Sequence, residues 1–305
     1  MKKNQLTSFT PPQVSDIKIT HAQRVIYPKS HLTKLDLVNY YDQISDYILP
    51  HLENRLISVV RCPQGLAGKC FFQRHENISS EFIHEFKIND QDIPYIYIKD
   101  KKGLLTLIQF GVIEIHAWCS RMDDINRPDR IIFDLDPDPK IPWEIIVDAA
   151  AEVKLRMDKL GLESFLRTTG GKGLHVVIPI KPHYEFAVIK SFARAFAQKM
   201  AADHPENYVV NMSKVKRQGK IFIDYLRNDL TSTAITSFSA RAHEDATIAM
   251  PLSWDDLDYD LDPKNFNLVT ISKYLKNRKS DPWEDVLGNK QTLTKALLKE
   301  LGVKV

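Results

Sequence analysis

Two aspartates that follow an apolar run are the strongest candidates for chemistry in this sequence. The run 131–133 leads into Asp134 and Asp136, and Pro137 ends it. An apolar run bounded by proline predicts a buried strand, and residues two apart on a strand share a face. Two carboxylates this close repel each other, and a divalent cation such as Mg²⁺ or Mn²⁺ would relieve the repulsion. The pattern therefore predicts a metal site.

A simpler interpretation is a polar strand end neutralised by a nearby arginine, for which Arg130 is a candidate. The same four residues recur as Asp260-Leu261-Asp262-Pro263, where aspartates rather than an apolar run precede them. We expect that second copy to be a solvated acidic loop. The tetrapeptide alone is thus a weak signal, and the preceding strand gives it meaning.

A third carboxylate, Asp224, ends another apolar run at 221–223. It is the natural third metal ligand. Two divalent ions held by such a set would clamp the attacking and leaving oxygens of an in-line displacement at phosphorus.

A glycine-rich turn lies between the predicted strands 165–167 and 176–178. It contains Thr169, Gly170, Gly171, Lys172, Gly173 and His175. Because it joins two strands, it is neither a P-loop nor a dinucleotide fingerprint, which both open a helix. Glycines let backbone N–H groups approach an anion, and the hydroxyl and cationic side chains suit phosphate. A plain hairpin turn is the alternative.

Four further residues are candidates for contact with a nucleic acid. Arg24 and Lys34 flank the start of a predicted helix from Thr33 to about Leu49, where unpaired N–H groups suit a phosphate. Of the adjacent Phe71 and Phe72 we expect one to be exposed, able to stack on a base. The alternatives are solvated surface charges and a pair that bridges two apolar clusters.

His116 ends the alternating strand 112–116, and Arg227 and Arg241 follow two later apolar segments. We expect His116 to lie in the same cleft as the aspartates, although a lone histidine at a strand end is more often structural.

Composition excludes several classes of protein. The 305 residues carry a formal net charge of only +3, so any nucleic-acid surface must be local, and the densest basic stretch is 214–220. No window approaches a membrane span, and no apolar run follows the first residues, so neither a membrane protein nor a signal peptide is expected. Cys62, Cys70 and Cys119 are expected to be buried, reduced thiols in a cytoplasmic protein.

The order of patterns predicts a mixed α/β fold around largely antiparallel sheet. Residues 1–16 lack periodicity and predict an extended arm. We expect an N-terminal module at about 17–110 and a catalytic module at about 111–250. Residues 251–305 begin as an acidic loop and end as a helical tail, which Trp283 and Leu287 should dock on the core.

Carboxylates at strand ends, a cationic glycine turn and scattered arginines together indicate metal-dependent phosphoryl or nucleotidyl transfer. A metal-dependent nuclease has less need of a triphosphate-binding turn. A non-catalytic module that binds DNA ends is the other alternative, although an idle acidic cluster would be costly to keep folded.

An ordered set of motifs resembles the polymerase domain of bacterial ATP-dependent DNA ligase D, within the archaeo-eukaryotic primase superfamily. The resemblance runs from about residue 17 to 287, and the predicted domain from 17 to 290. Its motifs are Thr33-Lys34-Leu35-Asp36, Arg61-Cys62-Pro63, Cys70-Phe71-Phe72-Gln73, Glu114-Ile115-His116-Ala117-Trp118, Asp134-Leu135-Asp136-Pro137, Gly170-Gly171-Lys172-Gly173-Leu174-His175, Phe222-Ile223-Asp224-Tyr225-Leu226-Arg227-Asn228 and Asp281-Pro282-Trp283.

The resemblance implies a primase-polymerase fold with an RRM-like catalytic module, and it implies roles for the matching residues. Asp134, Asp136 and Asp224 would hold two Mn²⁺ or Mg²⁺ ions. Thr169, Lys172, His175, Arg227 and Arg241 would contact the triphosphate, and His116 would border the nucleotide's base and sugar. Phe71 and Phe72 would stack on the template, and Arg24 and Lys34 would hold a 5′-phosphate.

The implied activity is addition of nucleotides, preferably ribonucleotides, to DNA 3′ ends at gaps and double-strand breaks during non-homologous end joining. Implied partners are Ku and a ligase, and the implied location is the nucleoid. The family usually has serine at Thr169 and lysine at Arg24, which preserves the hydroxyl and the charge. The chain contains no Lys-x-Asp-Gly nucleophile motif, so we expect a stand-alone polymerase or one domain of a larger enzyme.

Overall fold

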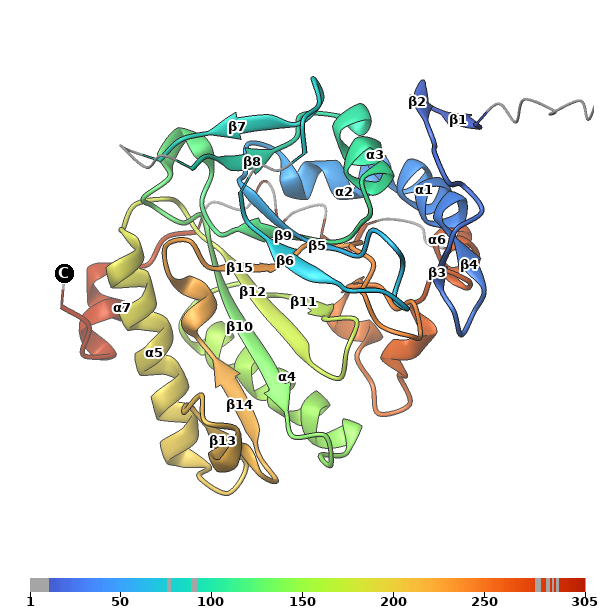
Figure 1. Ribbon diagram of the computed structural model, residues 1–305. Helices are drawn as coiled ribbons and strands as arrows, with labels where there is room; N and C mark the ends of the chain where they lie inside the picture. Colours follow the sequence, from blue (N-terminus) through green and yellow to red (C-terminus); the bar gives the residue numbers. More distant parts are fainter. Residues whose placement is uncertain are drawn as a thin grey trace, which may run out of the picture.

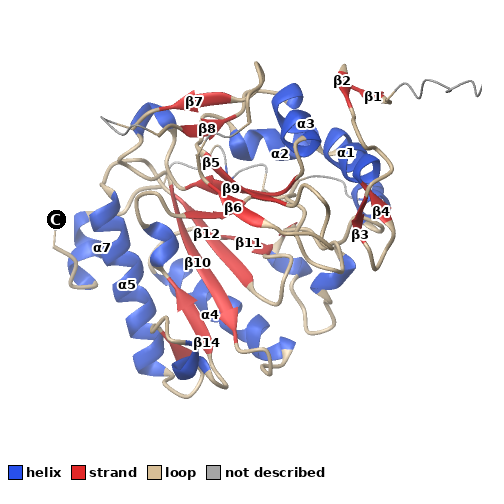
Figure 2. Cartoon of the chain, in the orientation of Figure 1, coloured by secondary structure: helices blue, strands red, loops and turns tan. Residues whose placement is uncertain are grey.

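Two mainly antiparallel sheets form the frame of the protein. The structure is a computed structural model, and it describes residues 11–75, 78–88, 93–277, 281–283, 286, 288 and 291–304. Residues 1–10 of the predicted arm and Leu287 lie outside the described residues. Figure 2 shows the strands gathered in the middle of the molecule with helices around them.

The first sheet carries both carboxylate strands. Its order is β13 (Tyr208–Val209), β14 (Ile221–Asp224), β10 (Arg130–Pro137), β12 (Leu174–Pro179), β11 (Phe165–Thr168) and β16 (Pro251–Leu252). Neighbouring strands are antiparallel except β13 and β14, which are parallel. The prediction of a mixed α/β fold with largely antiparallel sheet is confirmed.

The second sheet lies above the first in Figure 1. Its order is β15 (Thr233–Ile235), β9 (Val112–Trp118), β5 (Ile57–Arg61), β8 (Tyr95–Tyr97) and β7 (His84–Phe86), and β6 (Phe71–Gln73) also pairs with β5. The predicted division near residue 110 stays a prediction. The sheets do not follow it, because β9 and β15 come from the later part of the chain.

Helices surround the two sheets (Figure 1). They are α1 (Lys34–Gln43), α2 (Ser45–Leu52), α3 (Lys101–Gln109), α4 (Trp143–Lys159), α5 (Phe186–Asp203), α6 (Ile271–Asn277) and α7 (Lys295–Glu300). Short strands β1 (Gln13–Val14), β2 (Ile17–Lys18), β3 (Val25–Tyr27) and β4 (Leu32–Thr33) form two hairpin-like pairs near the N-terminal end. No helix among the described residues is long and apolar enough to span a membrane.

Local sequence signals account for several element ends. Thr33 and Asp36 form the capping box of α1, as predicted. The helix predicted from Thr33 to about Leu49 is instead two helices, because Ile44 leaves helical geometry with φ −98° and ψ 9° and caps both. The second Asp-Leu-Asp-Pro sequence is an exposed loop before a short 3₁₀ turn, which confirms that expectation.

The alternation predicted for the central strand β10 is confirmed. Phe133 and Leu135 are fully buried, and the Phe133 ring lies 4.7 Å from that of Phe196 on α5. Asp134 and Asp136 therefore project from the opposite face, away from α5 and toward the second sheet. The strand's apolar face fixes its orientation, and this leaves the carboxylates facing a cavity.

The prediction of three reduced thiols was wrong for two of the cysteines. Cys62 and Cys70 form a disulfide, while Cys119 is a buried free thiol. Cys62 directly follows β5 and Cys70 directly precedes β6. Since Arg61 pairs with Phe71 across these antiparallel strands, the two cysteines meet at the base of the connecting loop. Strand pairing across an eight-residue separation was not readable from cysteine spacing alone.

Candidate active site

Most of the predicted nucleotide and metal residues line one open cavity between the two sheets; Asp224 and Gly170 are not among its lining residues. Its volume is about 290 Å³. Its walls are His116, Asp134, Asp136, Thr169, Gly171, Lys172, Gly173, His175, Arg227, Thr233, Ala234, Ile235 and Arg241. Carboxylates from β10 thus face the glycine turn and His116 of β9. The expectation that His116 shares the cleft of the aspartates is confirmed.

Asp134 and Asp224 are brought together by strand pairing. They are direct cross-strand partners on β10 and β14. The Arg227 Nε lies 3.2 Å from an Asp134 oxygen and 3.3 Å from an Asp224 oxygen. Burial would raise the pKa of the Asp134 carboxyl, but His175 and Arg227 beside it hold that pKa well below its usual value. Asp134 therefore stays an anion in the cavity wall.

Asp136 is turned toward a residue of the basic stretch 214–220. The Arg217 Nη1 donates to an Asp136 oxygen at 2.6 Å, and its guanidinium stacks 3.9 Å from the centre of the Phe222 ring. Burial and the Asp134 charge raise the pKa of Asp136. Arg217 was not among the predicted site residues, and only its place in the densest basic stretch could have indicated it.

The donor set suits a hard divalent cation, because it consists of carboxylate oxygens that already attract cations. Arg227 lies between two of these carboxylates and Arg217 pairs with the third. With the side chains placed this way, the part of the chain that the structure describes holds no cluster of three His, Cys, Asp or Glu side chains fit for a metal ion. Both arginines must move aside before all three carboxylates can share an ion.

The glycine turn is shaped by its neighbours. Gly170 has φ +71°, and an added Cβ would lie 2.5 Å from the Arg241 Cγ. A Cβ on Gly173 would lie 2.5 Å from the Leu135 carbonyl oxygen on β10. The Thr169 hydroxyl donates to the Gly173 carbonyl at 3.1 Å, and Lys172 Nζ donates to the Pro139 carbonyl. Only glycine at positions 170 and 173 allows the turn to pack this closely against Arg241 and β10.

His175 is buried in the cavity wall, and burial lowers its pKa to about 4. Its Nε2 lies 3.3 Å from an Asp134 oxygen. At neutral pH the imidazole is therefore a neutral group.

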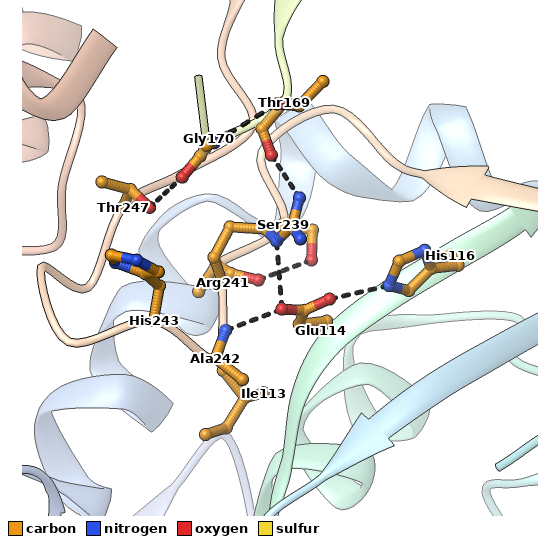
Figure 3. Close-up of polar contacts among 12 residues, drawn as sticks. Ile113, Glu114, His116, Thr169, Gly170, Ser239, Arg241, Ala242, His243 and Thr247 are labelled. Carbon is orange, nitrogen blue, oxygen red and sulfur yellow. Dashed lines mark hydrogen bonds and ion pairs between the residues drawn. The ribbon is translucent and has the colours of Figure 1, made fainter. Parts of the chain in front are cut away.

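A residue that sequence reasoning did not select links His116 to Arg241 (Figure 3). The Glu114 carboxylate accepts from His116 Nε2 at 2.8 Å, from Arg241 Nε at 3.0 Å and from the Ala242 N–H at 2.8 Å. Burial would raise its pKa, but the hydrogen bond from His116 and the Arg241 guanidinium lower the pKa to about 2. Strand alternation could have indicated it, since Glu114 and His116 share a face of β9.

The predicted DNA residues lie outside this cavity. Phe71 and Phe72 are 39% and 47% exposed, so both rings face solvent rather than one. The Phe72 ring lies 5.5 Å from that of His116, which places this aromatic pair beside the cavity. The Arg61 and Arg74 guanidiniums lie over the Phe71 and Phe72 rings, each 5.6 Å from the ring centre.

Arg24 and Lys34 form a separate basic site. Lys34 is only 5% exposed, and its Nζ donates to the Thr20 carbonyl and the Gln109 amide oxygen, each at 2.8 Å. Arg24 donates to the Pro63 carbonyl, in the loop that the disulfide closes. Burial and then the Arg24 charge lower the pKa of Lys34 to about 8. Thr20 and Gln109 were not predicted as parts of this site.

A carboxylate pair that lies opposite a glycine–lysine–histidine turn is the arrangement expected of an enzyme that transfers phosphoryl or nucleotidyl groups. The family model described as "LigD, primase-polymerase domain" matches residues 33–283. The chain therefore belongs to the family of LigD primase-polymerase domains. The expected class of enzyme, a nucleotidyltransferase, agrees with this family.

Named relatives support the same family. The chain is 33% identical over 290 residues to the Multifunctional non-homologous end joining protein LigD of Pseudomonas aeruginosa, covering 94% of the chain and 34% of the relative. It is 29% identical over 289 residues to the Bifunctional non-homologous end joining protein LigD of Bacillus subtilis, covering 94% of the chain and 47% of that relative. The chain thus spans about a third to a half of these relatives.

A solved structure has the same fold. The polymerase domain from Mycobacterium tuberculosis Ligase D in complex with DNA matches with a TM-score of 0.82 at 24% sequence identity. The match covers 90% of this chain and 99% of that one. The predicted primase-polymerase fold is confirmed.

Proposed function

We propose that this chain is a metal-dependent polymerase that adds nucleotides to the 3′ end of DNA at gaps and breaks during non-homologous end joining. The observation that carries the proposal is the cavity itself, in which carboxylates from β10 face the glycine turn. Anionic oxygens for metal ions and N–H groups for phosphates are the two parts that nucleotidyl transfer needs. The relatives' names give the repair pathway.

In the proposed reaction, a primer 3′-oxygen forms a bond to the α-phosphorus of a nucleoside triphosphate, and the bond to pyrophosphate breaks. Asp134, Asp136 and Asp224 would hold two Mn²⁺ or Mg²⁺ ions, which neutralise charge on the reacting oxygens. The turn residues Gly170 and Gly171 would present N–H groups to the phosphates, and the Thr169 hydroxyl would donate to them after it releases the Gly173 carbonyl.

Cationic and polar side chains around the turn complete the proposed triphosphate site. Lys172, Arg241 and Arg227 supply positive charge, and His175 supplies a hydrogen bond. Arg217, which donates to Asp136, would have to release that carboxylate for it to hold a metal ion.

The aromatic pair and the basic site suit the two sides of a DNA gap. His116 would border the base and sugar of the nucleotide, with Phe71 and Phe72 stacked on template bases beside it. Arg24 and Lys34 would hold the 5′-phosphate across the gap. Preference for ribonucleotides, association with Ku and a ligase, and a place at the nucleoid belong to the same proposal.

Extension of a primer on gapped DNA tests the proposal. With Mn²⁺ and nucleoside triphosphates, we expect addition of one or a few templated nucleotides when the downstream strand carries a 5′-phosphate. UTP should be used more efficiently than dTTP. Shortening of the primer would instead indicate a nuclease. Tight 5′-phosphate-dependent binding without extension would indicate a binding module, and equal use of UTP and dTTP would contradict the ribonucleotide preference.

The low pKa of Lys34 predicts that discrimination for the 5′-phosphate weakens above neutral pH. Lys34 loses its proton near pH 8 in the free protein, and a bound phosphate moves that midpoint upward. The phosphate itself stays doubly charged throughout. We expect the affinity advantage of 5′-phosphorylated over unphosphorylated gapped DNA to fall about tenfold between roughly pH 7 and pH 10. Fluorescence anisotropy would measure both affinities.

Lys34→Met is the matched control for this pH effect. The substitution removes the titrating group. The variant should therefore prefer 5′-phosphorylated DNA less than the wild type does, and this preference should not change with pH over the same pH range. A wild-type preference that is constant up to about pH 10 would show that Lys34 does not hold the phosphate.

A further inference from the structure

A buried arginine lies in register with the carboxylates, two strands away. Arg167 on β11 pairs with His175 on β12, and His175 pairs with Asp134 on β10. Asp134 pairs in turn with Asp224 on β14. Residues paired directly across strands lie side by side on one face of a sheet. Arg167 thus begins a row of polar side chains that ends at the proposed metal site.

Arg167 determines where the proton of His175 resides. Its Nε and Nη2 lie 3.1 Å and 2.9 Å from His175 Nδ1. An arginine nitrogen can only donate, so Nδ1 must present its lone pair as acceptor. The single proton of a neutral imidazole is then on Nε2. Nε2 is the atom beside Asp134, and His175 lines the cavity.

Trp283, from the C-terminal tail, holds Arg167 in this orientation. The guanidinium carbon lies 5.5 Å from the centre of the Trp283 ring. The indole Nε1 donates to the Leu166 carbonyl at 2.8 Å, next to Arg167 on β11. Arg167 and Trp283 are 2% and 1% exposed, so neither side chain has room to turn. The expectation that Trp283 docks the tail on the core is confirmed.

The contacts of Arg167 differ from those of another fully buried arginine. Arg55, which is 1% exposed, directs its guanidinium to the Asp129 carboxylate. That is the usual way to balance a buried cation. Arg167 instead directs two nitrogens at one imidazole nitrogen. This contact does not neutralise the arginine charge. It fixes which nitrogen of His175 accepts a hydrogen bond.

We propose that Arg167, held by Trp283, is a positioning residue that keeps His175 in the Nε2–H tautomer, so that it donates a hydrogen bond to a phosphate in the cavity. The part that concerns phosphate rests on the proposed function. With the proton on Nδ1, the same histidine would present a lone pair to an anion and repel it. The tail would therefore contribute to nucleotide binding without contacting the nucleotide.

Nitrogen NMR of the full chain labelled with ¹⁵N-histidine tests this assignment directly. In the free wild-type protein near pH 7.5, the signal lost in His175→Gln should show a protonated Nε2 and an unprotonated Nδ1. Arg167→Met should give a mixture of tautomers or the Nδ1–H form. Its dissociation constant for UTP with Mn²⁺, from equilibrium titration, should rise about tenfold. Trp283→Leu, which keeps Arg167 but removes its support, should move both readouts in the same direction by less.

Arg55→Met is the matched control, because it removes another buried arginine with no contact to His175 among those described. It should leave the His175 signal and UTP affinity unchanged even if it lowers the melting temperature.

A wild-type Nδ1–H signal would overturn the proposal. An unchanged tautomer in both Arg167→Met and Trp283→Leu would also overturn it. If Arg167→Met does not fold, the tautomer in Trp283→Leu is the test. The predicted tautomer together with no binding of UTP would uphold the Arg167–His175 assignment and overturn the proposed function instead.

Discussion

Asp136→Ala is expected to lower the rate of primer extension by at least about a hundredfold while leaving the protein as stable as the wild type. The loss of rate follows from removing one carboxylate of the proposed metal site, where a single lost stabilising group costs about that much or more. Gapped-primer extension with Mn²⁺ and nucleoside triphosphates measures the rate. Thermal unfolding measures the stability.

The stability half of this prediction follows from the sign of the Asp136 pKa shift. Burial and the neighbouring Asp134 raise its pKa. A carboxyl whose pKa is higher in the folded than in the unfolded state opposes folding at any pH above its unfolded pKa, and neutral pH lies in that range. Removing it therefore gives up only the hydrogen bond from Arg217. A functional carboxylate that the fold does not need is the expected sign of a catalytic role.

The second Asp-Leu-Asp-Pro sequence provides a matched control. Asp260→Ala makes the same chemical change in the same four-residue sequence, at its first rather than its third position, because Asp262 caps the following 3₁₀ turn; Asp260 lies on an exposed loop outside the cavity. The substitution should change neither extension nor stability. Full extension by Asp136→Ala would exclude this residue as a metal ligand. Loss of extension accompanied by a large drop in melting temperature would show that the residue is structural.

The parts of the site that could be predicted were those that depend on residues within a single strand or turn. Alternation along β10 fixed the common face of Asp134 and Asp136, because Phe133 and Leu135 had to be buried. The glycine turn was recognisable because its glycines, threonine and histidine all lie within residues 169–175. Such features depend on periods of two residues and on turn chemistry, which the local sequence contains.

The parts that could not be predicted depend on pairings between distant segments. Arg217 reaches Asp136 from 81 residues away, and Glu114 reaches Arg241 from 127 residues away. Arg167 and Trp283 meet only because the tail returns to β11. The disulfide was missed for the same reason, since strand pairing rather than spacing brings Cys62 to Cys70. A single sequence shows which side chains can ionise, but not which of them will meet.

Glu114→Gln is expected to lower the free energy of unfolding at neutral pH by about 3 kcal/mol. The carboxylate has a pKa of about 2 in the folded protein, against its ordinary value of 4.5. A carboxyl with a lowered folded pKa stabilises the fold above its unfolded pKa, and this contribution is lost as pH falls through the folded value. Glutamine cannot carry the charge that faces Arg241 and His116. Urea unfolding of both proteins measures the difference.

The same change should weaken nucleotide binding, because Glu114 fixes both His116 and Arg241 at the cavity wall. We expect the KM for the nucleotide to rise more than kcat falls, since the proposed metal ligands are untouched. Glu53→Gln removes an exposed carboxylate that pairs with Arg121, and it should change neither stability nor KM by much.

The pH dependence separates the charge of Glu114 from its packing. The difference in stability between wild type and Glu114→Gln should be constant near neutral pH and shrink as pH falls from about 4.5 toward 2, because protonated glutamate and glutamine then become equivalent. A difference that persists undiminished at the acid end would mean that Glu114 acts by shape alone. In that case Arg241 would owe its position to the Thr169 carbonyl to which it also donates, and the cavity wall would not depend on a buried charge.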